Sequence, residues 1–237
     1  LQGSYNAQDN LMRDDLRVLG LIPLTEPYTN LGYTQVGGGG GETTTPTVLS
    51  VTGNTAIVDW VLLELRNFGD VDQILGTRSA LVRRDGQIVS TDGNSDIIFG
   101  VPPSNYLLAV RHRNHLGVMT LNPPGPQFVD FTLSSTATYG HQISAPQAVL
   151  ESGVYGLWAG DVNRDNLVKY TGSGNDRDPI LTKLGGLVPT NTVSGYWSED
   201  VNMEGVVKYT GTDNDRDRIL QIIGGVIPTN VVEGRAP

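Results

Sequence analysis

Residues 1–140 alternate short apolar runs with clusters of turn-forming residues. Runs rich in Val, Ile and Leu and bounded by Gly, Pro, Asn and Asp predict β-strands. The pair Asp85-Gly86 between two of these runs is typical of a β-hairpin turn. We therefore expect an antiparallel, immunoglobulin-like β-sandwich over residues 1–140, with an extended segment at 1–18. The runs lie at residues 56–65, 74–83, 96–101, 106–113 and 127–133.

A sequence repeat with an offset of 39 residues, from Asp161 to Asp200, indicates that residues 151–237 form a second domain. Each copy, at about 155–193 and about 194–232, has an acidic stretch and then an apolar helical pattern that ends at a Gly-Gly pair. Small and polar residues at 134–147 predict a linker, and we place the domain boundary at 141–150. The matching segments are Asp161-Val162-Asn163 and Asp200-Val201-Asn202, Val168-Lys169-Tyr170-Thr171-Gly172 and Val207-Lys208-Tyr209-Thr210-Gly211, and Asn175-Asp176-Arg177-Asp178 and Asn214-Asp215-Arg216-Asp217.

The first copy places oxygen-bearing groups at positions 1, 3, 5 and 7 of a tight loop, which is the spacing of an EF-hand-type calcium loop. Position 12 should carry a closing carboxylate, but Gly172 stands there. With about four residues inserted into such a loop, either Asp176 or Asp178 closes the site from the start of a helix capped by Asn175. The other four ligands are Asp161, Asn163, Asp165 and the main-chain carbonyl of Leu167.

The second copy repeats this set of ligands. Carboxylates drawn together in one loop repel one another, and a divalent cation turns that cost into binding energy. Oxygen ligands without His or Cys suit Ca²⁺. A solvated acidic turn is the alternative, but two copies in register favour about two bound Ca²⁺ ions. At position 6 the turn needs a left-handed residue, which Gly205 supplies in one copy and Asn166 in the other. The second set is Asp200, Asn202, Glu204, the carbonyl of Val206, and Asp215 or Asp217.

Composition and charge exclude several kinds of partner and chemistry. A net charge of −9 argues against a nucleic acid held through its phosphates. The chain has no cysteine, which excludes disulfides and thiolate metal sites. No apolar run is long enough to insert into a membrane. The sequence does not start like a signal peptide, so for an exported protein we expect the signal to have been removed already.

No reactive constellation is visible, and we do not expect an enzyme. No nucleophile stands beside a base, and no zinc-protease motif occurs. His112 and His115 lie at odd spacing in a predicted strand, so we expect them on opposite faces rather than on one metal. Asp59 and Glu64 are likewise expected on opposite faces, which argues against a paired-carboxylate glycosidase site. The glycine run at 37–41 predicts a flexible loop or a place where another backbone passes closely.

The paired loops resemble the duplicated calcium loops of type I dockerin modules. Together with residues 12–17 and 110–119, they more closely resemble the C-terminal repeats of large secreted proteins of the Bacteroidota. This resemblance implies an extracellular or cell-surface location and calcium binding. A dockerin binds its cohesin partner through residues near loop positions 10 and 11, where Ser-Thr is frequent. Here these positions hold Tyr170-Thr171 and Tyr209-Thr210.

These inferences favour a secreted, calcium-stabilised structural or adhesive surface protein, the repeating subunit of an extracellular fibre assembled head to tail from copies of itself. The alternative is a dockerin-like or carbohydrate-binding module of a larger secreted protein, with cell-surface proteins or glycans as partners. Residues 1–10 have little apolar content and no evident hairpin partner, and residues 234–237 are not expected to fold back. We therefore expect both ends to pair with another subunit, unless both dock onto their own domain. Trp158 and Trp197, which precede the two loops, are expected to pack the repeats together or onto the sandwich, with ligand stacking as the alternative.

Overall fold

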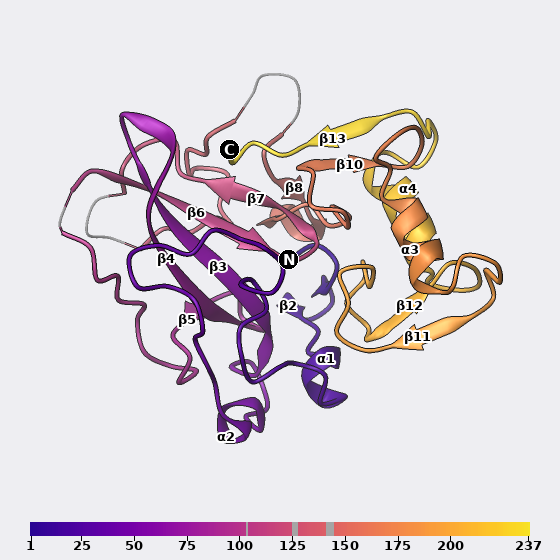
Figure 1. Ribbon diagram of the computed structural model, residues 1–237, viewed down its shortest axis with the longest axis horizontal. Helices are drawn as coiled ribbons and strands as arrows, with labels where there is room; N and C mark the ends of the chain where they lie inside the picture. Colours follow the sequence, from indigo (N-terminus) through magenta and orange to yellow (C-terminus); the bar gives the residue numbers. More distant parts are fainter. Residues whose placement is uncertain (103, 125–127, 141–144) are drawn as a thin grey trace.

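The computed structural model describes residues 1–102, 104–124, 128–140 and 145–237, and its fold is mainly β (Figure 1). His141, Gln127 and residues 141–144 of the predicted linker lie outside the described residues. No helix in the described ranges has the length and apolar character that crossing a membrane requires.

The largest sheet is antiparallel and contains five strands in the order β5-β4-β3-β6-β7. Three of the predicted strands, and the hairpin at Asp85-Gly86, are confirmed. Gly86 adopts φ +87°, which a side chain at this turn would disfavour. Nearly every residue of β3 is buried, as is usual for a central strand covered on both faces. The strands are β3 (Ile57–Asn67), β4 (Asp70–Arg83), β5 (Ile88–Val89), β6 (Tyr106–His112) and β7 (His115–Met119).

Two of the predicted strands are absent from the described residues. Residues 96–101 run without strand pairing, although Ile97 and Phe99 pack their side chains against the core. Residues 128–133 form a turn instead, because the Asp130 carboxylate accepts hydrogen bonds from the backbone N–H of Thr132 (2.8 Å) and from its hydroxyl (2.6 Å). Some apolar residues of these segments therefore pack on the core without forming strands, whereas Ile98 and Phe128 are exposed.

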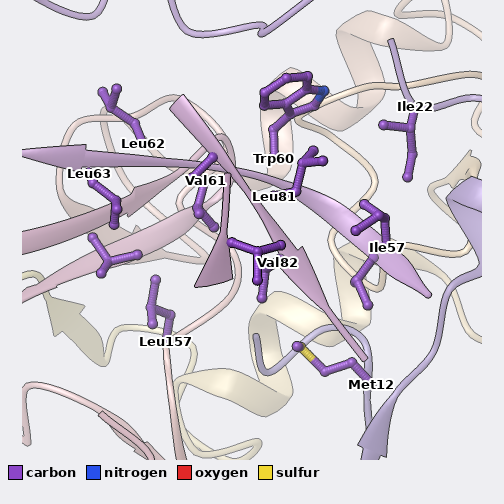
Figure 2. Close-up of a cluster of buried hydrophobic side chains, with 14 of the residues drawn as sticks. Met12, Ile22, Ile57, Trp60, Val61, Leu62, Leu63, Leu81, Val82 and Leu157 are labelled. Atoms are coloured by element: carbon purple, nitrogen blue, oxygen red, sulfur yellow. The ribbon is translucent and has the colours of Figure 1, made fainter. Parts of the chain in front are cut away.

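The main hydrophobic core lies on the sheet and includes side chains from both halves of the sequence. Figure 2 shows Trp60 and Leu81 of the sheet in one cluster with Met12 and Leu157, which come from segments far apart in the chain. Trp60 is fully buried and its indole N–H donates to the carbonyl of Pro23 (2.9 Å). A few side chains of the second half, such as Leu157 and Met203, thus belong to the core of the sheet, while most buried apolar side chains of the repeat module form a second core.

Short strands, short helices and a glycine-rich segment before and after the sheet pack around it. The glycine run at 37–41 lets two backbones approach: a Cβ at Gly39 would lie 2.4 Å from the carbonyl oxygen of Thr77. The expectation of a close backbone passage there is confirmed. The elements are β1 (Tyr5–Asn6), β2 (Leu11–Met12), α1 (Asp15–Val18), α2 (Pro46–Leu49), β8 (Ala148–Val149), η1 (Glu151–Gly153) and β9 (Tyr155–Gly156).

The repeat module has two copies of a strand, a helix and a second strand, and the copies exchange their second strands. β11, which follows the first helix, pairs with β12 of the second copy, and β13 pairs back with β10 of the first. Figure 1 shows α3 and α4 side by side between these two hairpin-like pairs. Both predicted helices, and their ends near Gly-Gly pairs, are confirmed. The elements are β10 (Leu167–Lys169), α3 (Arg177–Lys183), β11 (Thr192–Ser194), β12 (Val206–Lys208), α4 (Asp215–Ile222) and β13 (Val231–Glu233).

Both ends of the chain contact their own fold. Tyr5–Asn6 (β1) pairs with Leu11–Met12 (β2), so the expectation that the first segment lacks a hairpin partner is wrong. The carbonyl of Ala236, a fully buried residue, accepts a hydrogen bond from the Arg111 guanidinium (3.2 Å). The expectation that residues 234–237 do not fold back is also wrong, because β13 carries them to a buried position beside the sheet.

Candidate metal centre

Each repeat loop brings carboxylates into a buried position. In the first loop Asp161 is 6% exposed and Asp176 is fully buried. Asp176 accepts hydrogen bonds from the backbone N–H of Val162 (2.8 Å) and Lys169 (2.8 Å), so it joins the start of the loop to β10. Burial raises the pKa of Asp161 to about 7 and that of Asp176 to about 7, and the charge of Asp161 adds to the rise at Asp176. The two carboxylates are therefore close enough to repel each other when both are charged.

One oxygen of this group has no hydrogen-bond partner. Asp161 Oδ1 is buried and receives no hydrogen bond from any described residue. An unpaired carboxylate oxygen out of contact with water is costly, and it is the type of group that a cation compensates. The residues present thus fit a hard cation bound beside Asp161.

The remaining predicted ligands of the first loop lie around the same point. Asn163 Nδ2 donates to Asp165 Oδ2 (3.1 Å). Burial is the main cause of the raised pKa of Asp161, and the negative charge of Asp165 raises it further. The N–H of Leu167 donates to Asp165 Oδ1 (3.1 Å). The carbonyl of the preceding residue, Asn166, accepts a hydrogen bond from the N–H of Gly234, which directly follows β13 (2.8 Å). Since alternate residues of an antiparallel strand direct N–H and C=O away from the partner, the Leu167 carbonyl faces the loop.

The structure separates the two candidates for the closing carboxylate. Asp178 is exposed on the outer side of α3, where Asn175 Nδ2 donates to it (2.8 Å) and Arg177 forms an ion pair with it (3.3 Å). Asp176 instead lies buried against the loop. Asn175 accepts a hydrogen bond from the N–H of Asp178 (3.0 Å), which is the bond expected of a helix-capping side chain.

The second loop repeats the arrangement with Asp200 and Asp215, both fully buried. Asp215 accepts from the N–H groups of Val201 (2.7 Å) and Lys208 (2.8 Å). Burial and the charge of Asp200 raise the pKa of Asp215 to about 8. Burial also raises the pKa of Asp200, with a smaller contribution from Glu204.

The outer ligands of the second loop are placed like those of the first. The amide of Asn202 donates to the carbonyl of Asp213 (2.9 Å), and its oxygen accepts from the N–H of Glu204 (3.1 Å). The hydrogen bond from Gly195 N–H to the Gly205 carbonyl (3.1 Å) puts the neighbouring Val206 carbonyl on the loop side of β12. Asp217, like Asp178, lies outside the loop and pairs with Arg216 (2.8 Å).

Three differences distinguish the second loop from the first. Both oxygens of Asp200 accept hydrogen bonds, from the N–H of Glu204 (3.1 Å) and of Gly205 (2.8 Å), whereas Asp161 Oδ1 accepts none. Glu204 forms an ion pair with Lys208, which would have to loosen for Glu204 to bind a cation. The charge of Arg113, from the sheet, opposes the rise in the pKa of Asp200. Gly205 (φ +87°) and Asn166 (φ +66°) adopt the left-handed conformation that the sequence predicts for position 6.

The β6–β7 turn, which sequence reasoning missed, inserts into the second loop. Arg113 is 1% exposed; its Nε donates to Asp59 (3.1 Å), and another nitrogen of its guanidinium donates to the carbonyl of Trp197. Asn114 donates to the carbonyl of Asp200 (2.7 Å). Arg113-Asn114 contains no glycine or proline, so no turn was predicted there.

The expectation that His112 and His115 lie on opposite faces is wrong. The turn ends β6 at His112 and starts β7 at His115, so the two residues pair across the hairpin. Their rings meet edge to face with centroids 4.6 Å apart and Nδ1 atoms 2.9 Å apart, and both are buried. Odd spacing separates faces only while one strand continues.

The hydrogen bonds around this pair define one tautomer for each ring. His115 Nε2 accepts from Gly3 N–H (3.3 Å), so its Nδ1 carries the proton. This Nδ1 donates to Asn114 Oδ1 (2.8 Å) and lies 2.9 Å from His112 Nδ1. His112 Nε2 then donates to Asp59 (3.0 Å), whose other oxygen accepts from the Tyr196 hydroxyl (2.5 Å). Each neutral histidine has its partners within this buried network.

The two carboxylates of β3 belong to separate buried groups. Asp59 joins the histidine network described above. Glu64 instead accepts from Arg66 (2.8 Å) and Arg111 (3.2 Å). The two carboxylates therefore take part in different hydrogen-bond networks.

The two tryptophans that precede the loops have different surroundings. Trp158 packs against the core of the repeat module, as expected, and its indole N–H donates to the carbonyl of Ala145 (3.1 Å). Trp197 is 37% exposed and carries the Lys183 ammonium 3.4 Å from its ring centroid. The sequence repeat therefore does not extend to the environment of these side chains.

Within the described ranges, no group of three or more His, Asp or Glu side chains forms a ready metal-binding cluster. Each candidate site instead has side-chain carboxylates together with one Asn side-chain oxygen and one main-chain carbonyl oxygen. A scan against family models and searches of curated proteins and of solved structures found no match to this chain.

Proposed function

We propose that each repeat loop binds one Ca²⁺ ion and that the ions hold the repeat module on the sheet. The first site uses Asp161, Asn163, Asp165, the Leu167 carbonyl and Asp176. The second uses Asp200, Asn202, Glu204, the Val206 carbonyl and Asp215. When bound, the ion supplies positive charge to buried carboxylates that otherwise repel each other.

The unpaired, buried Oδ1 atom of Asp161 is the observation that carries this proposal. The pKa values of Asp161, Asp176 and Asp215, all raised by burial to between about 7 and about 8, support it. A carboxylate kept in such a place without a cation would cost the fold stability, whereas a bound cation restores both charge balance and coordination. In this proposal the repeats are a dockerin-like module and the sheet belongs to an immunoglobulin-like sandwich.

The broader function that fits these sites is a secreted, calcium-stabilised structural or adhesive protein of the cell surface. Loops with Asn ligands, and with one carboxylate already paired to Lys208, suit the weak sites of extracellular modules, with dissociation constants of about 10⁻⁴–10⁻³ M. Calcium then acts as a structural clamp and not in catalysis. We infer that the protein works by keeping its shape and contacting neighbouring surface molecules.

Head-to-tail assembly into a fibre stays a prediction. Both ends of the chain find pairing partners within the same chain, since β1 pairs with β2 and β13 pairs with β10. Sedimentation of the purified chain in calcium tests the prediction directly: a series of oligomers favours the fibre, and a monomer favours a module of a larger protein.

Dockerin-like binding to a cohesin is the alternative function. Thr171 and Thr210 stand near the loop positions that a dockerin uses, and each donates across the module, Thr171 to the Pro228 carbonyl (3.0 Å) and Thr210 to the Pro189 carbonyl (3.1 Å). Tyr170 and Tyr209 stack with Arg177 and Arg216. These side chains are engaged within the module, which favours the structural function over this one.

Chelation tests the proposed function. Because calcium binds only the folded loops, excess calcium should raise the free energy of unfolding by RT ln(1 + [L]/Kd), about 2.7 kcal/mol at a hundredfold excess over Kd. We expect chelation to lower the melting temperature and calcium, but not an equal concentration of sodium salt, to restore it. A melting temperature that chelation leaves unchanged would refute the proposal.

A further inference from the structure

A hollow of about 270 Å³ lies where the N-terminal segment, the second loop and α4 meet. Trp158, Val201 and Ile222 supply apolar lining. The polar side chains of the lining are Gln2, Asn202, Arg218 and Gln221. The volume is close to the lower end of the range for ligand pockets, about 300–1,000 Å³, so it suits a group the size of one sugar ring.

The polar side chains of the hollow are held so that their donors stay available. Gln2 Oε1 accepts from the N–H of Ala159 (3.0 Å), which leaves its NH₂ group facing away from that bond. Gln221 Oε1 accepts from Arg218 Nη1 (3.1 Å), which leaves the Gln221 NH₂ group free to donate in the same way. The indole is fixed through its bond to Ala145. A pocket with fixed donors and an aromatic wall is prepared for a polar ring.

The charge of this hollow is opposite to that of the molecule. The chain carries −9, yet Arg218 is the charged residue of the lining, and no Asp or Glu is among the lining residues that the structure describes. The neighbouring helix arginines Arg177 and Arg216 are paired with Asp178 and Asp217, whereas Arg218 is exposed and has no ion pair within the described ranges. A guanidinium in this position favours a carboxylate ligand.

The internal repeat provides a second argument. The copies match closely around their helices, but α4 has Arg218 and Gln221 where α3 has Pro179 and Thr182. The polar rim therefore exists in one copy only. A feature that serves the common fold of the two repeats would be expected in both.

We propose that this hollow binds a hexuronate residue of a glycan. The C–H face of the pyranose ring stacks on Trp158, the hydroxyl groups accept from Gln2 and Gln221, and the carboxylate pairs with Arg218. This inference goes beyond calcium binding and uses none of the carboxylates of the two loops. It gives the surface protein a class of partner, an acidic polysaccharide.

Titration of the full chain in saturating calcium with methyl β-glucuronoside tests the inference, with methyl β-glucoside and glutarate as comparisons. We expect the glucuronoside to bind about tenfold more tightly than either comparison, since a charge-assisted hydrogen bond and ring stacking each contribute about that factor. Arg218→Gln should weaken glucuronoside binding about tenfold while leaving glucoside binding unchanged. Trp158→Leu should weaken both sugars.

Trp197→Leu, at the repeat counterpart of Trp158, and Arg177→Gln, at an arginine on the other helix, are the controls and should leave both affinities unchanged. Arg218 is exposed, so its variant is expected to fold even if Trp158→Leu does not. Absence of glucuronoside binding would overturn the inference. Equal binding of glutarate, or a glucuronoside preference that survives Arg218→Gln, would overturn it as well.

Discussion

The side-chain amide of Asn114 donates to the main-chain carbonyl of Asp200 over 2.7 Å and to that of Ser198 over 3.1 Å. Asn114 lies at the turn between two strands of the sheet, and Asp200 is the first candidate ligand of the second loop. The pair therefore joins the sheet directly to the candidate calcium site. Anything that orders this loop should also stabilise the sheet.

Asn114→Ala should reduce both stability and calcium affinity. The change removes two hydrogen bonds and leaves buried carbonyl groups unpaired, so we expect a loss of about 1–3 kcal/mol in the free energy of unfolding, measured by urea denaturation in calcium. Asn94→Ala, at an exposed turn, is the control and should change stability little. Equal stability of the two variants would argue against the coupling.

Asp176→Asn and Asp178→Asn should differ sharply in calcium binding. Asp176 is buried against the first loop, whereas Asp178 is exposed and pairs with Arg177. We expect Asp176→Asn to remove the first site and Asp178→Asn to leave its affinity within about twofold, since an exposed ion pair contributes little. Calorimetric titration of both variants measures this, and loss of the site in Asp178→Asn alone would show that the wrong carboxylate was chosen.

Because the two copies exchange their second strands, we expect the calcium site of the first copy to depend on β13, which ends the second copy. A chain that ends at Asn230 lacks β13, the partner of β10, which carries the Leu167 carbonyl. We expect such a chain to bind calcium more weakly at the first site and to keep the second, whose β12 is still paired with β11. The Asp200→Asn variant of the shortened chain isolates the first site for the titration. Unchanged affinity there would contradict the dependence.

Acid should destabilise the fold through the two buried histidines. Burial lowers the pKa of His112, against the opposing effect of Asp59, and lowers that of His115 further, with His112, the N-terminal amine and Arg113 adding to the effect. The unfolded chain takes up protons below pH about 6.5 while the folded chain does not, so stability present above this pH should fall as pH decreases. The curves must be measured in saturating calcium, which keeps the loop carboxylates charged in the folded chain, and between pH 7.5 and 5 they should show this slope. Without calcium, the raised pKa values of Asp161, Asp176 and Asp215 act in the opposite direction.

His115→Asn is the control for this pH dependence. It removes one of the two titrating rings and should reduce the slope while leaving the calcium carboxylates in place. Because both proteins carry the same loops, the difference between them isolates the histidine contribution. Identical slopes would contradict the assignment of neutral, buried rings.

Local patterns predicted the candidate ligands of the two loops, whereas non-local contacts decide the surroundings of these and other side chains. Asp161, Asn163 and Asp165 are candidates because a loop that wraps an ion takes its ligands from neighbouring positions. The choice of Asp176 over Asp178 depends on which side of α3 faces the loop, and the spacing alone left both open. The histidine pair was missed because Asn114 is a single turn-forming residue within the run that predicts a continuous strand.

The candidate glycan hollow could not be predicted from the sequence either. Trp158, Gln2 and Arg218 lie in distant segments that meet only through the docking of the repeat module on the sheet. Two expected strands also failed, because apolar residues such as Phe99 and Phe131 pack on the core from irregular backbone. Hydrophobic pattern reports burial more directly than it reports strand pairing.

Calorimetric titration of the intact chain with calcium tests the central claim most directly. We expect two bound ions per chain, and one after either Asp161→Asn or Asp200→Asn, because each variant removes the first ligand of one loop. Magnesium, which demands a tighter octahedral shell, should bind more weakly. No uptake of calcium by the intact chain, or two ions still bound by both variants, would contradict the account.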